Sequence, residues 1–443
     1  MQKKYYGVTI AVAITLCLGG CGGKEEASAA DMEAVMETRE TIENDEIITE
    51  DRNEAETVTD AEPTDTGETE VKAIEIEIAQ KELPESETLA FVKDMKIGWN
   101  LGNTFDAIDC NWLSDEMQYE SSWCGTVTTK EMIDALKEAG FRTIRIPVSW
   151  HNHLTDENHT ISEAWINRVQ EVVDYAIDDD MYVIINIHHD FSKEYIYPSS
   201  EYLEQSKSYV TDIWEQIAER FKDYDEHLIM ESLNEPRLIG TDNEWWLDIK
   251  KEVCIDSVQC INELNQTFVE VVRASGGNNA DRYLMVPGYA ASLEGATNQY
   301  FALPEDIDGN QDKILVSVHA YTPYAFALQA SGESGSVDSF SADRIDSTKD
   351  IDYLMDELYE KYIQNGTGVV IGEFGARDKN NNIQARTEFA AYYIKAARAR
   401  GISCCWWDNN AFAGDGENFG LFNRQEIAFS YPEILENLMA NCE

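Results

Sequence analysis

Eight short apolar runs alternate with longer amphipathic stretches between residues 91 and 443, and this alternation constrains the fold more than any other feature of the chain. A short apolar run followed by an amphipathic stretch is the pattern of a parallel strand and its crossover helix. The pattern predicts strands over residues 97–101, 143–147, 182–187, 228–233, 283–286, 314–318, 368–371 and 402–406. It predicts helices over residues 129–139, 163–178, 202–221, 264–274, 350–363 and 385–400.

Eight such units in this order predict an α/β fold, a (β/α)8 TIM barrel that forms a single domain. A doubly wound open sheet is the alternative, because it also alternates strands with helices. Polar and aromatic clusters favour the barrel, since they stand where predicted strands end, and the carboxyl ends of barrel strands meet on one face. The clusters are residues 99–103, Arg145 with Trp150, 188–190, 234–236, 319–321, 373–374 and 406–409.

Two carboxylates stand out in these clusters, Glu235 after the fourth predicted strand and Glu373 after the seventh. Such a pair suits glycoside hydrolysis, in which one carboxylic acid protonates the leaving oxygen and an ionised carboxylate attacks the anomeric carbon. A separation of about 5–5.5 Å gives net retention, whereas a wider gap admits a water and gives inversion. The sequence leaves this distance open, and the alternative is that either glutamate is an ordinary salt-bridge partner.

The chain is strongly acidic, with 84 Asp and Glu against 34 Lys and Arg and a formal net charge of −50. This balance excludes nucleic acid as a partner, because phosphates are bound by basic surfaces. It also disfavours acidic polysaccharides, which the negative charge would repel. Aromatic residues make up 10% of the chain and provide rings on which a neutral ligand can stack.

The first 21 residues have the features of a secretory signal, with a basic start at Lys3 and Lys4 and an apolar run too short to span a bilayer. The run ends in Leu-Gly-Gly followed by Cys21, which resembles the lipobox of bacterial lipoproteins. We therefore predict lipidation at Cys21 and an exported, cell-surface lipoprotein held on a bacterial membrane by its lipid alone. An ordinary signal peptide is the alternative.

Residues 22–90 contain 23 Asp and Glu against 5 Lys and Arg, and no Phe, Tyr or Trp. A segment of this composition cannot bury enough apolar surface to fold, so we predict a disordered acidic linker before the catalytic domain at residues 91–443. Residues 71–79 alternate apolar and acidic side chains, which leaves a short docking segment as the alternative there.

Seven of the nine cysteines lie in the predicted barrel domain. Disulfides between Cys110 and Cys124 and between Cys254 and Cys260, in predicted surface loops, are compatible with export, and the pairing is left open. No spacing matches a zinc site and the chain has only seven His, so we predict no metal and no cofactor.

Seven motifs together resemble glycoside hydrolase family 5, and most closely its subfamily 4 of endo-β-1,4-glucanases and xyloglucanases. They are GWNLGNTFDA at 98–107, RIPVSW at 145–150, HHD at 188–190, LNEP at 233–236, HAY at 319–321, GEFG at 372–375 and WWDN at 406–409. Each motif is short, but their order and spacing across residues 91–443 are specific. The resemblance implies a (β/α)8 fold, endo-acting cleavage and net retention of configuration.

Carried over position by position, the resemblance implies that Glu235 is the acid/base and Glu373 the nucleophile. Asn234 would donate to the sugar 2-hydroxyl, and Arg145 and Tyr321 would hold the nucleophile ionised. The implied substrate-binding residues are Arg145, His188, His189, Asn234, His319, Tyr321 and Trp407, although the broader family has one histidine where this chain has His188 and His189.

Trp407 matches the aromatic platform beneath the sugar at the cleavage site, because a pyranose C–H face stacks on an indole ring. Trp406 is the alternative platform. Asn103, His151 and His153 are second-rank substrate-binding candidates. Tryptophans 112, 123, 150, 245 and 246 are candidates for further subsites, with burial in the core or a loop as the alternative for each.

The sequence thus predicts a monomeric enzyme that cleaves β-1,4-glucosidic bonds of plant cell-wall β-glucans, namely cellulose-like glucans, mixed-linkage β-glucan or xyloglucan. A β-mannanase or xylanase with the same machinery is one alternative, and a non-catalytic glycan-binding lipoprotein is another. Residues 119–129 and 244–260 depart from the subfamily pattern, which leaves the preference among glucans open.

Overall fold

The computed structural model describes residues 73–306, 310, 312–414 and 416–442. The predicted signal at residues 1–21, with Cys21, and residues 22–72 of the predicted linker lie outside the described residues. Within the described part, no helix combines the length and the apolar character needed to cross a bilayer.

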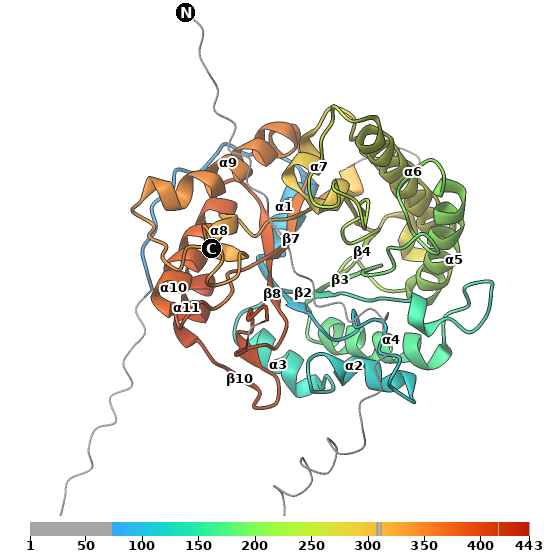
Figure 1. Cartoon of the computed structure of the whole chain (residues 1–443), viewed down its shortest axis with the longest axis horizontal. Coiled ribbons are helices and arrows are strands. Elements are labelled where there is room, and N and C mark those ends of the chain that lie inside the picture. Colours follow the sequence, from blue (N-terminus) through green and yellow to red (C-terminus); the bar gives the residue numbers. More distant parts are fainter. Residues whose placement is uncertain (1–72, 307–309, 311, 415, 443) are drawn as a thin grey trace, which may run out of the picture. The chain divides into compact units, whose positions relative to one another are not determined.

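Eight parallel strands close into a barrel in the order β1 to β8, with helices around them (Figure 1). Closure occurs between β1 and β8, where Ile97 pairs with Cys404 and Leu101 with Asp408. The predicted TIM barrel is therefore confirmed, and the open sheet is excluded. The strands are β1 (Ile97–Leu101), β2 (Thr143–Ile146), β3 (Tyr182–Asn186), β4 (Leu228–Glu231), β5 (Leu284–Pro287), β6 (Ile314–His319), β7 (Val369–Phe374) and β8 (Ser403–Asp408), with a separate pair β9 (Phe422–Asn423) and β10 (Ala428–Phe429).

The helices pack one apolar face on the barrel. In α4, for example, Trp165, Val169, Val172 and Ala176 recur at helical spacing and are fully buried. The helices are α1 (Glu87–Asp94), α2 (Tyr119–Ser122), α3 (Lys130–Glu138), α4 (Glu163–Asp178), α5 (Leu203–Phe221), α6 (Glu252–Ala274), α7 (Leu293–Thr297), α8 (Tyr324–Ala327), α9 (Ile345–Lys361), α10 (Ile383–Arg398) and α11 (Pro432–Ala440). Short 3-10 turns are η1 (Glu116–Gln118), η2 (His151–His153), η3 (Gly277–Ala280), η4 (Tyr289–Ala291) and η6 (Ile363–Asn365).

Helix α6 begins twelve residues before the predicted start at residue 264. The prediction missed these first turns because they lack a side-chain cap and mix polar with apolar residues. The prediction that Cys254 and Cys260 lie in a surface loop is wrong, since both are buried in this helix. Six residues of helix rise by about 9 Å, which is beyond the reach of a disulfide. Cys110 and Cys124 are likewise free thiols in the described structure.

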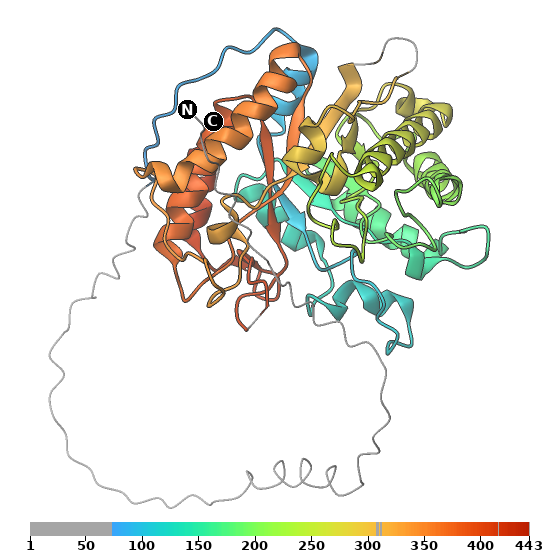
Figure 2. The same cartoon turned by 45° about the horizontal axis from the view of Figure 1, so that its top comes forward.

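The folded part begins earlier than the predicted boundary at residue 91. Residues 73–86, which we call the strap, run extended beside α9 and α10 and lead into α1 (Figures 1 and 2). Ile74 N–H donates to Asn437 Oδ1 of α11 over 2.8 Å, and Lys81 N–H donates to the Ala399 carbonyl over 2.8 Å. The predicted linker is thus wrong for residues 73–90, because backbone contacts supplement the few apolar side chains. The docking alternative, which is limited to residues 71–79, holds for residues 73–79.

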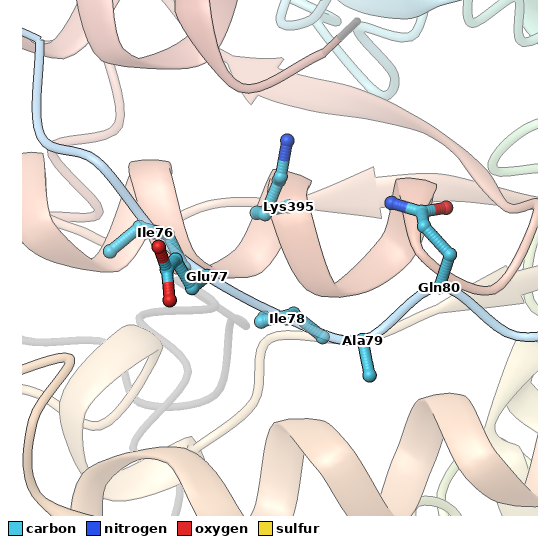
Figure 3. A pocket seen from close by; sticks show the side chains of 6 residues that line it. All are labelled: Ile76, Glu77, Ile78, Ala79, Gln80 and Lys395. Atoms are coloured by element: carbon cyan, nitrogen blue, oxygen red, sulfur yellow. The ribbon is translucent and has the colours of Figure 1, made fainter.

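The strap lies loosely against α10. Ile76 and Ile78 are half-buried and pack on the core, and a hollow of about 590 Å³ remains between residues 76–80 and Lys395 (Figure 3). Further along the strap, Lys81 Nζ lies 3.0 Å from Asp356 Oδ1 of α9. The strap therefore covers apolar surface and leaves an open depression beside Lys395.

Removal of the strap is expected to destabilise the barrel. A chain of residues 87–443 should have a free energy of unfolding about 2–4 kcal/mol below that of residues 73–443, because it loses the partial burial of Ile76 and Ile78 and several hydrogen bonds. Urea unfolding of the two chains, followed by tryptophan fluorescence, measures the difference. Equal midpoints would show that the strap contributes nothing to stability.

Candidate active site

The candidate residues gather where the strands end. His319 is the last residue of β6 and pairs directly with Glu373 of β7, while Asn100 of β1 pairs with Trp407 of β8. A register irregularity between residues 318 and 319 shifts the end of β6 relative to β7. Strand pairing therefore places the histidine beside one of the two predicted catalytic carboxylates.

Arg145, in β2, is the centre of the polar network. Its Nε donates to Glu231 over 2.8 Å, and its Nη1 donates to Glu373 over 2.8 Å and to Asn100 over 3.0 Å. Its Nη2 donates to Asn234 Oδ1 over 2.7 Å. Burial lowers the pKa of Arg145, but Glu231 and Glu373 outweigh it and raise the pKa above its usual value. Arg145 is therefore a fully buried, permanent cation that orients its carboxylate and amide neighbours.

Glu373 is fixed from two sides. One oxygen accepts from Arg145, and the other accepts from the Tyr321 hydroxyl over 2.9 Å. Burial and the charge of Glu373 raise the pKa of Tyr321 well above its ordinary value, so the phenol remains a donor. Two donors at a side chain that is 7% exposed hold the carboxylate in one orientation.

Glu235 has different neighbours. Its Oε1 lies 2.9 Å from His319 Nδ1, and its Oε2 lies 3.5 Å from Arg237 Nη1. Burial raises the pKa of Glu235, but the hydrogen bond and charge of His319 and the charge of Arg237 outweigh it and lower the pKa. Burial lowers the pKa of His319, but Glu373 and Glu235 raise it above its ordinary value. These opposite shifts favour an ion pair of protonated His319 with ionised Glu235.

The two carboxylates are close to each other. One oxygen of Glu235, one oxygen of Glu373 and a ring nitrogen of His319 all lie within 4.8 Å of one another. A pair of carboxyl groups about 5–5.5 Å apart is the spacing of double displacement, in which the second carboxylate attacks directly, and a gap of about 6.5–9.5 Å is needed for inversion. The geometry therefore fits retention.

His188 presents a donor to the barrel mouth. Asn186 is fixed because its Oδ1 accepts from Val148 N–H over 3.1 Å and its Nδ2 donates to Glu231 over 3.0 Å. The same Nδ2 lies 3.2 Å from His188 Nδ1, so this ring nitrogen accepts. Burial lowers the pKa of His188 well below its ordinary value, and the single proton of the neutral ring is left on Nε2.

Asp106, His188 and His189 have donor atoms within 4.8 Å of one another, which raises the question of a metal. A metal at His188 Nε2 needs the lone pair that the proton occupies there. The Asp106 oxygens already accept the N–H groups of Asn103 and Thr104. Burial and Arg237 lower the pKa of His189 to about 4, so it is neutral at pH 7, which is the form in which an imidazole can ligate a metal. One imidazole does not make a metal site, and the hydrogen bonds that His188 and Asp106 already make fit hydrogen bonding rather than metal ligation.

Trp407 and Trp406 point to opposite sides of β8. Trp406 is fully buried, and its indole N–H donates to the Phe419 carbonyl over 3.1 Å, so it belongs to the core and the alternative platform is wrong. Trp407 is 8% exposed and its ring is parallel to that of His188, with the centroids 6.0 Å apart. A Cβ at Gly102 would meet the Trp407 ring at 2.9 Å, so the ring rests on bare backbone.

Some candidates lie away from the carboxylates. His153 is buried and stacks on Trp165 with the ring centroids 3.5 Å apart, and Trp150 is fully buried with its indole N–H on the Asn186 carbonyl, so both belong to the core. His151 is bound to Asp190, with 2.6 Å between Nδ1 and Oδ1.

Asn103 lies in the turn after β1 with φ of 58°. Among the described residues its amide has no hydrogen bond to either catalytic candidate. The remaining tryptophans stay exposed on loops that follow the strands, at 72% for Trp112, 39% for Trp123 and Trp245 and 70% for Trp246.

Sequence reasoning missed three residues that shape the site. Glu231 is fully buried and also accepts from Ser317 over 2.6 Å, and Asn100 donates to the Gly372 carbonyl over 2.9 Å. Arg237 flanks Glu235. The sequence did contain a signal for Glu231, because this charged residue lies inside the apolar run at residues 228–233. A carboxylate buried in a strand needs a cation beside it, and that cation is Arg145.

A family model for cellulase, glycosyl hydrolase family 5, matches residues 106–413, which include both carboxylates. The chain belongs to glycoside hydrolase family 5. This family is the one that the seven motifs predict, and its members are glycoside hydrolases, so the non-catalytic alternative is set aside.

Relatives within family 5 are endoglucanases and lichenases. Endoglucanase B of Ruminococcus albus is 44% identical over 369 residues, covering 82% of this chain and 83% of that protein. A family 5 lichenase from Caldicellulosiruptor sp. F32 superposes with a TM-score of 0.83 at 58% identity, covering 84% of this chain and 100% of the other. A broad-specificity endoglucanase of subfamily 4 from Ruminococcus champanellensis, with bound cellotriose, gives a TM-score of 0.73 at 44% identity, covering 81% and 100%.

Proposed function

We propose that this family 5 enzyme is a retaining endo-β-1,4-glucanase in which Glu373 is the nucleophile and Glu235 the acid/base. The observation that carries the proposal is the spacing within 4.8 Å of two carboxylates with different partners. Glu373 accepts hydrogen bonds from Arg145 and Tyr321, whereas Glu235 is paired with the titratable ring of His319, from which a proton can be supplied. Such unequal environments assign the acid and the nucleophile.

In the first displacement, Glu373 attacks the anomeric carbon from below while the glycosidic oxygen departs on the side of Glu235. The proton held between Glu235 and His319 passes to the leaving oxygen, and the bond from the anomeric carbon to that oxygen breaks. A covalent glycosyl ester on Glu373 results. The ester on Glu373 no longer carries the negative charge that faced Arg145. Arg145 remains paired with Glu231, so it does not become an isolated buried charge.

In the second displacement, water enters the place of the departed sugar. Ionised Glu235 takes a proton from it, the oxygen attacks the anomeric carbon, and the ester bond to Glu373 breaks. Two inversions give a product with the configuration of the substrate. The proton returns to Glu235 and His319, which resets the pair.

The remaining site residues are suited to hold the sugar. The amide oxygen of Asn234 accepts a hydrogen bond from Arg145, so the NH2 group of Asn234 is left as a donor for the sugar 2-hydroxyl. This contact strengthens at the oxocarbenium-like transition state. His188 offers Nε2–H for a further hydroxyl. Trp407 provides the ring on which the sugar stacks.

For the substrate we propose neutral β-1,4-linked glucans, with mixed-linkage β-glucan leading. The lichenase with 58% identity supports this order, and the broad-specificity relative supports activity on linear glucans. Release of reducing ends by residues 73–443 on mixed-linkage β-glucan, carboxymethyl-cellulose, xyloglucan, glucomannan and xylan tests it. A lead for xyloglucan would change the assigned preference, and a lead for xylan or glucomannan would contradict the glucanase assignment.

We also propose that Cys21 carries a lipid and that residues 22–72 tether the enzyme outside the cell. The signal-like first 21 residues and the Leu-Gly-Gly-Cys sequence support this. Cys21→Ser should release the full chain from the membrane fraction, whereas Cys17→Ser, a matched change within the signal, should leave it bound. A Cys21→Ser protein that still sediments with membranes would contradict lipidation.

A further inference from the structure

Arg237 lies directly against Glu235. Its Nη1 donates to the backbone carbonyl of Glu235 over 2.9 Å and lies 3.5 Å from the carboxylate Oε2 of the same residue. Its Nε lies 3.4 Å from Glu244, and the ring of Trp245 stacks on the guanidinium with 3.9 Å between the Cζ atom and the ring centroid. The side chain is 12% exposed, so the cation is held rather than free in solvent.

The loop that carries these partners is itself fixed. The hydroxyl of Tyr289, a fully buried residue, accepts from Leu238 N–H over 3.1 Å and donates to the Asn243 carbonyl over 2.7 Å. Glu244 accepts from Gly240 N–H over 2.9 Å. The stack of Trp245 and Arg237 therefore stands on a closed loop, and the position of the guanidinium is set before any substrate arrives.

We infer that Arg237 is a positioning residue for Glu235, which holds the carboxylate in place and favours the ionised form that activates water in the second displacement. His319 supplies the proton to one oxygen of Glu235, and Arg237 opposes protonation from beside the other. The inference rests on the proposed role of Glu235 as acid/base.

Several charged or titratable groups face Glu235, and Arg237 differs from the others in two ways. Its guanidinium stays charged wherever a histidine titrates, and it lies beside Oε2, whereas His319 contacts Oε1. The groups that face Glu235 from the surrounding strand ends and loops are His189, Arg237, His319, Tyr321, Glu373 and Glu417. A constant positive charge beside the carboxylate favours its ionised form, which is the product of proton donation in the first displacement and the starting form of the base in the second.

The sign of the effect follows from this charge. A nearby cation lowers the pKa of a carboxyl group, so its removal keeps Glu235 protonated to higher pH. The alkaline limb of kcat/KM should therefore move up by about one pH unit in Arg237→Met. The acid limb should stay in place, because the contacts of Arg145 and Tyr321 with Glu373 are unchanged in this variant.

The test is the pH profile of kcat/KM on mixed-linkage β-glucan for residues 73–443 and four variants. Arg237→Met removes the charge, and Arg237→Lys keeps a charge without the planar fork. Lys250→Met is the matched control, since it removes one positive charge from an exposed position on the same loop. Trp245→Leu removes the ring that stacks on Arg237 and should shift the alkaline limb upward by less than Arg237→Met does. If Arg237→Met fails to fold, the Trp245→Leu profile tests the inference in its place.

The expected order of alkaline shifts is Arg237→Met, then Trp245→Leu, then Arg237→Lys, with no shift for Lys250→Met. An unmoved alkaline limb in the folded Arg237 and Trp245 variants would overturn the inference, as would an equal shift in Lys250→Met. The proposed function fails separately, through full activity of a Glu373→Ala variant measured in the same assay.

Discussion

Glu373→Ala is expected to lower kcat on β-glucan by roughly 10⁴-fold or more, because it removes the carboxylate that forms the glycosyl ester in the proposed mechanism. Binding of a cello-oligosaccharide should persist, since Asn234, His188 and Trp407 are untouched. The loss should therefore appear in kcat, with the dissociation constant measured by calorimetry changed only a few-fold.

Azide gives this prediction a specific signature. In Glu373→Ala the small anion can occupy the vacated position below the anomeric carbon, so an aryl cellobioside with a good leaving group should yield the α-cellobiosyl azide. Glu231→Gln is a matched control, because it changes a buried carboxylate on the same arginine and leaves Glu373 in place. Near-normal turnover by Glu373→Ala would contradict the assignment of the nucleophile.

Glu235→Ala is expected to show a loss that depends on the leaving group. On β-glucan, whose leaving oxygen needs a proton, kcat/KM should fall by roughly 10²–10⁴-fold. On a dinitrophenyl cellobioside, whose leaving group departs as an anion, the first displacement should be nearly unaffected, and the slow second displacement should give a burst of phenolate. Stopped-flow absorbance measures this burst.

Azide should act on Glu235→Ala with the opposite stereochemistry. It would enter from the side of the missing base and attack the glycosyl ester, so the product should be the β-cellobiosyl azide. Equal losses on β-glucan and on the dinitrophenyl substrate would contradict an acid/base role, because a residue needed only for folding or binding does not discriminate between leaving groups.

The barrel and the ring of polar strand ends were predictable because both depend on local pattern. The apolar runs marked the strands, and Glu235, His319 and Glu373 each stood within two residues of the predicted end of such a run. Side chains alternate along β8, so Trp406 and Trp407 must point to opposite faces of the strand. Which of the two points to the barrel mouth depends on how β8 pairs with β1 when the barrel closes, and the sequence does not show this pairing.

What escaped prediction depends on contacts between distant parts of the chain. The carboxylate of Glu231 meets Arg145 from β2, and Arg237 meets Trp245 only because the loop folds back on Tyr289. The strap was assigned to the linker on its composition, yet its backbone finds partners on helices near the end of the chain, such as Asn437. Sequence pattern alone carries no information about such pairings.

The most direct test of the double displacement is to trap its intermediate on the enzyme. A dinitrophenyl 2-deoxy-2-fluoro-β-cellobioside slows both steps, because the fluorine destabilises the oxocarbenium-like transition state, while the good leaving group still allows the first step. Mass spectrometry of residues 73–443 should show one added fluorocellobiosyl group, located by peptide mapping on Glu373. A label on any other residue, or none while the enzyme releases product of inverted configuration, would contradict the account.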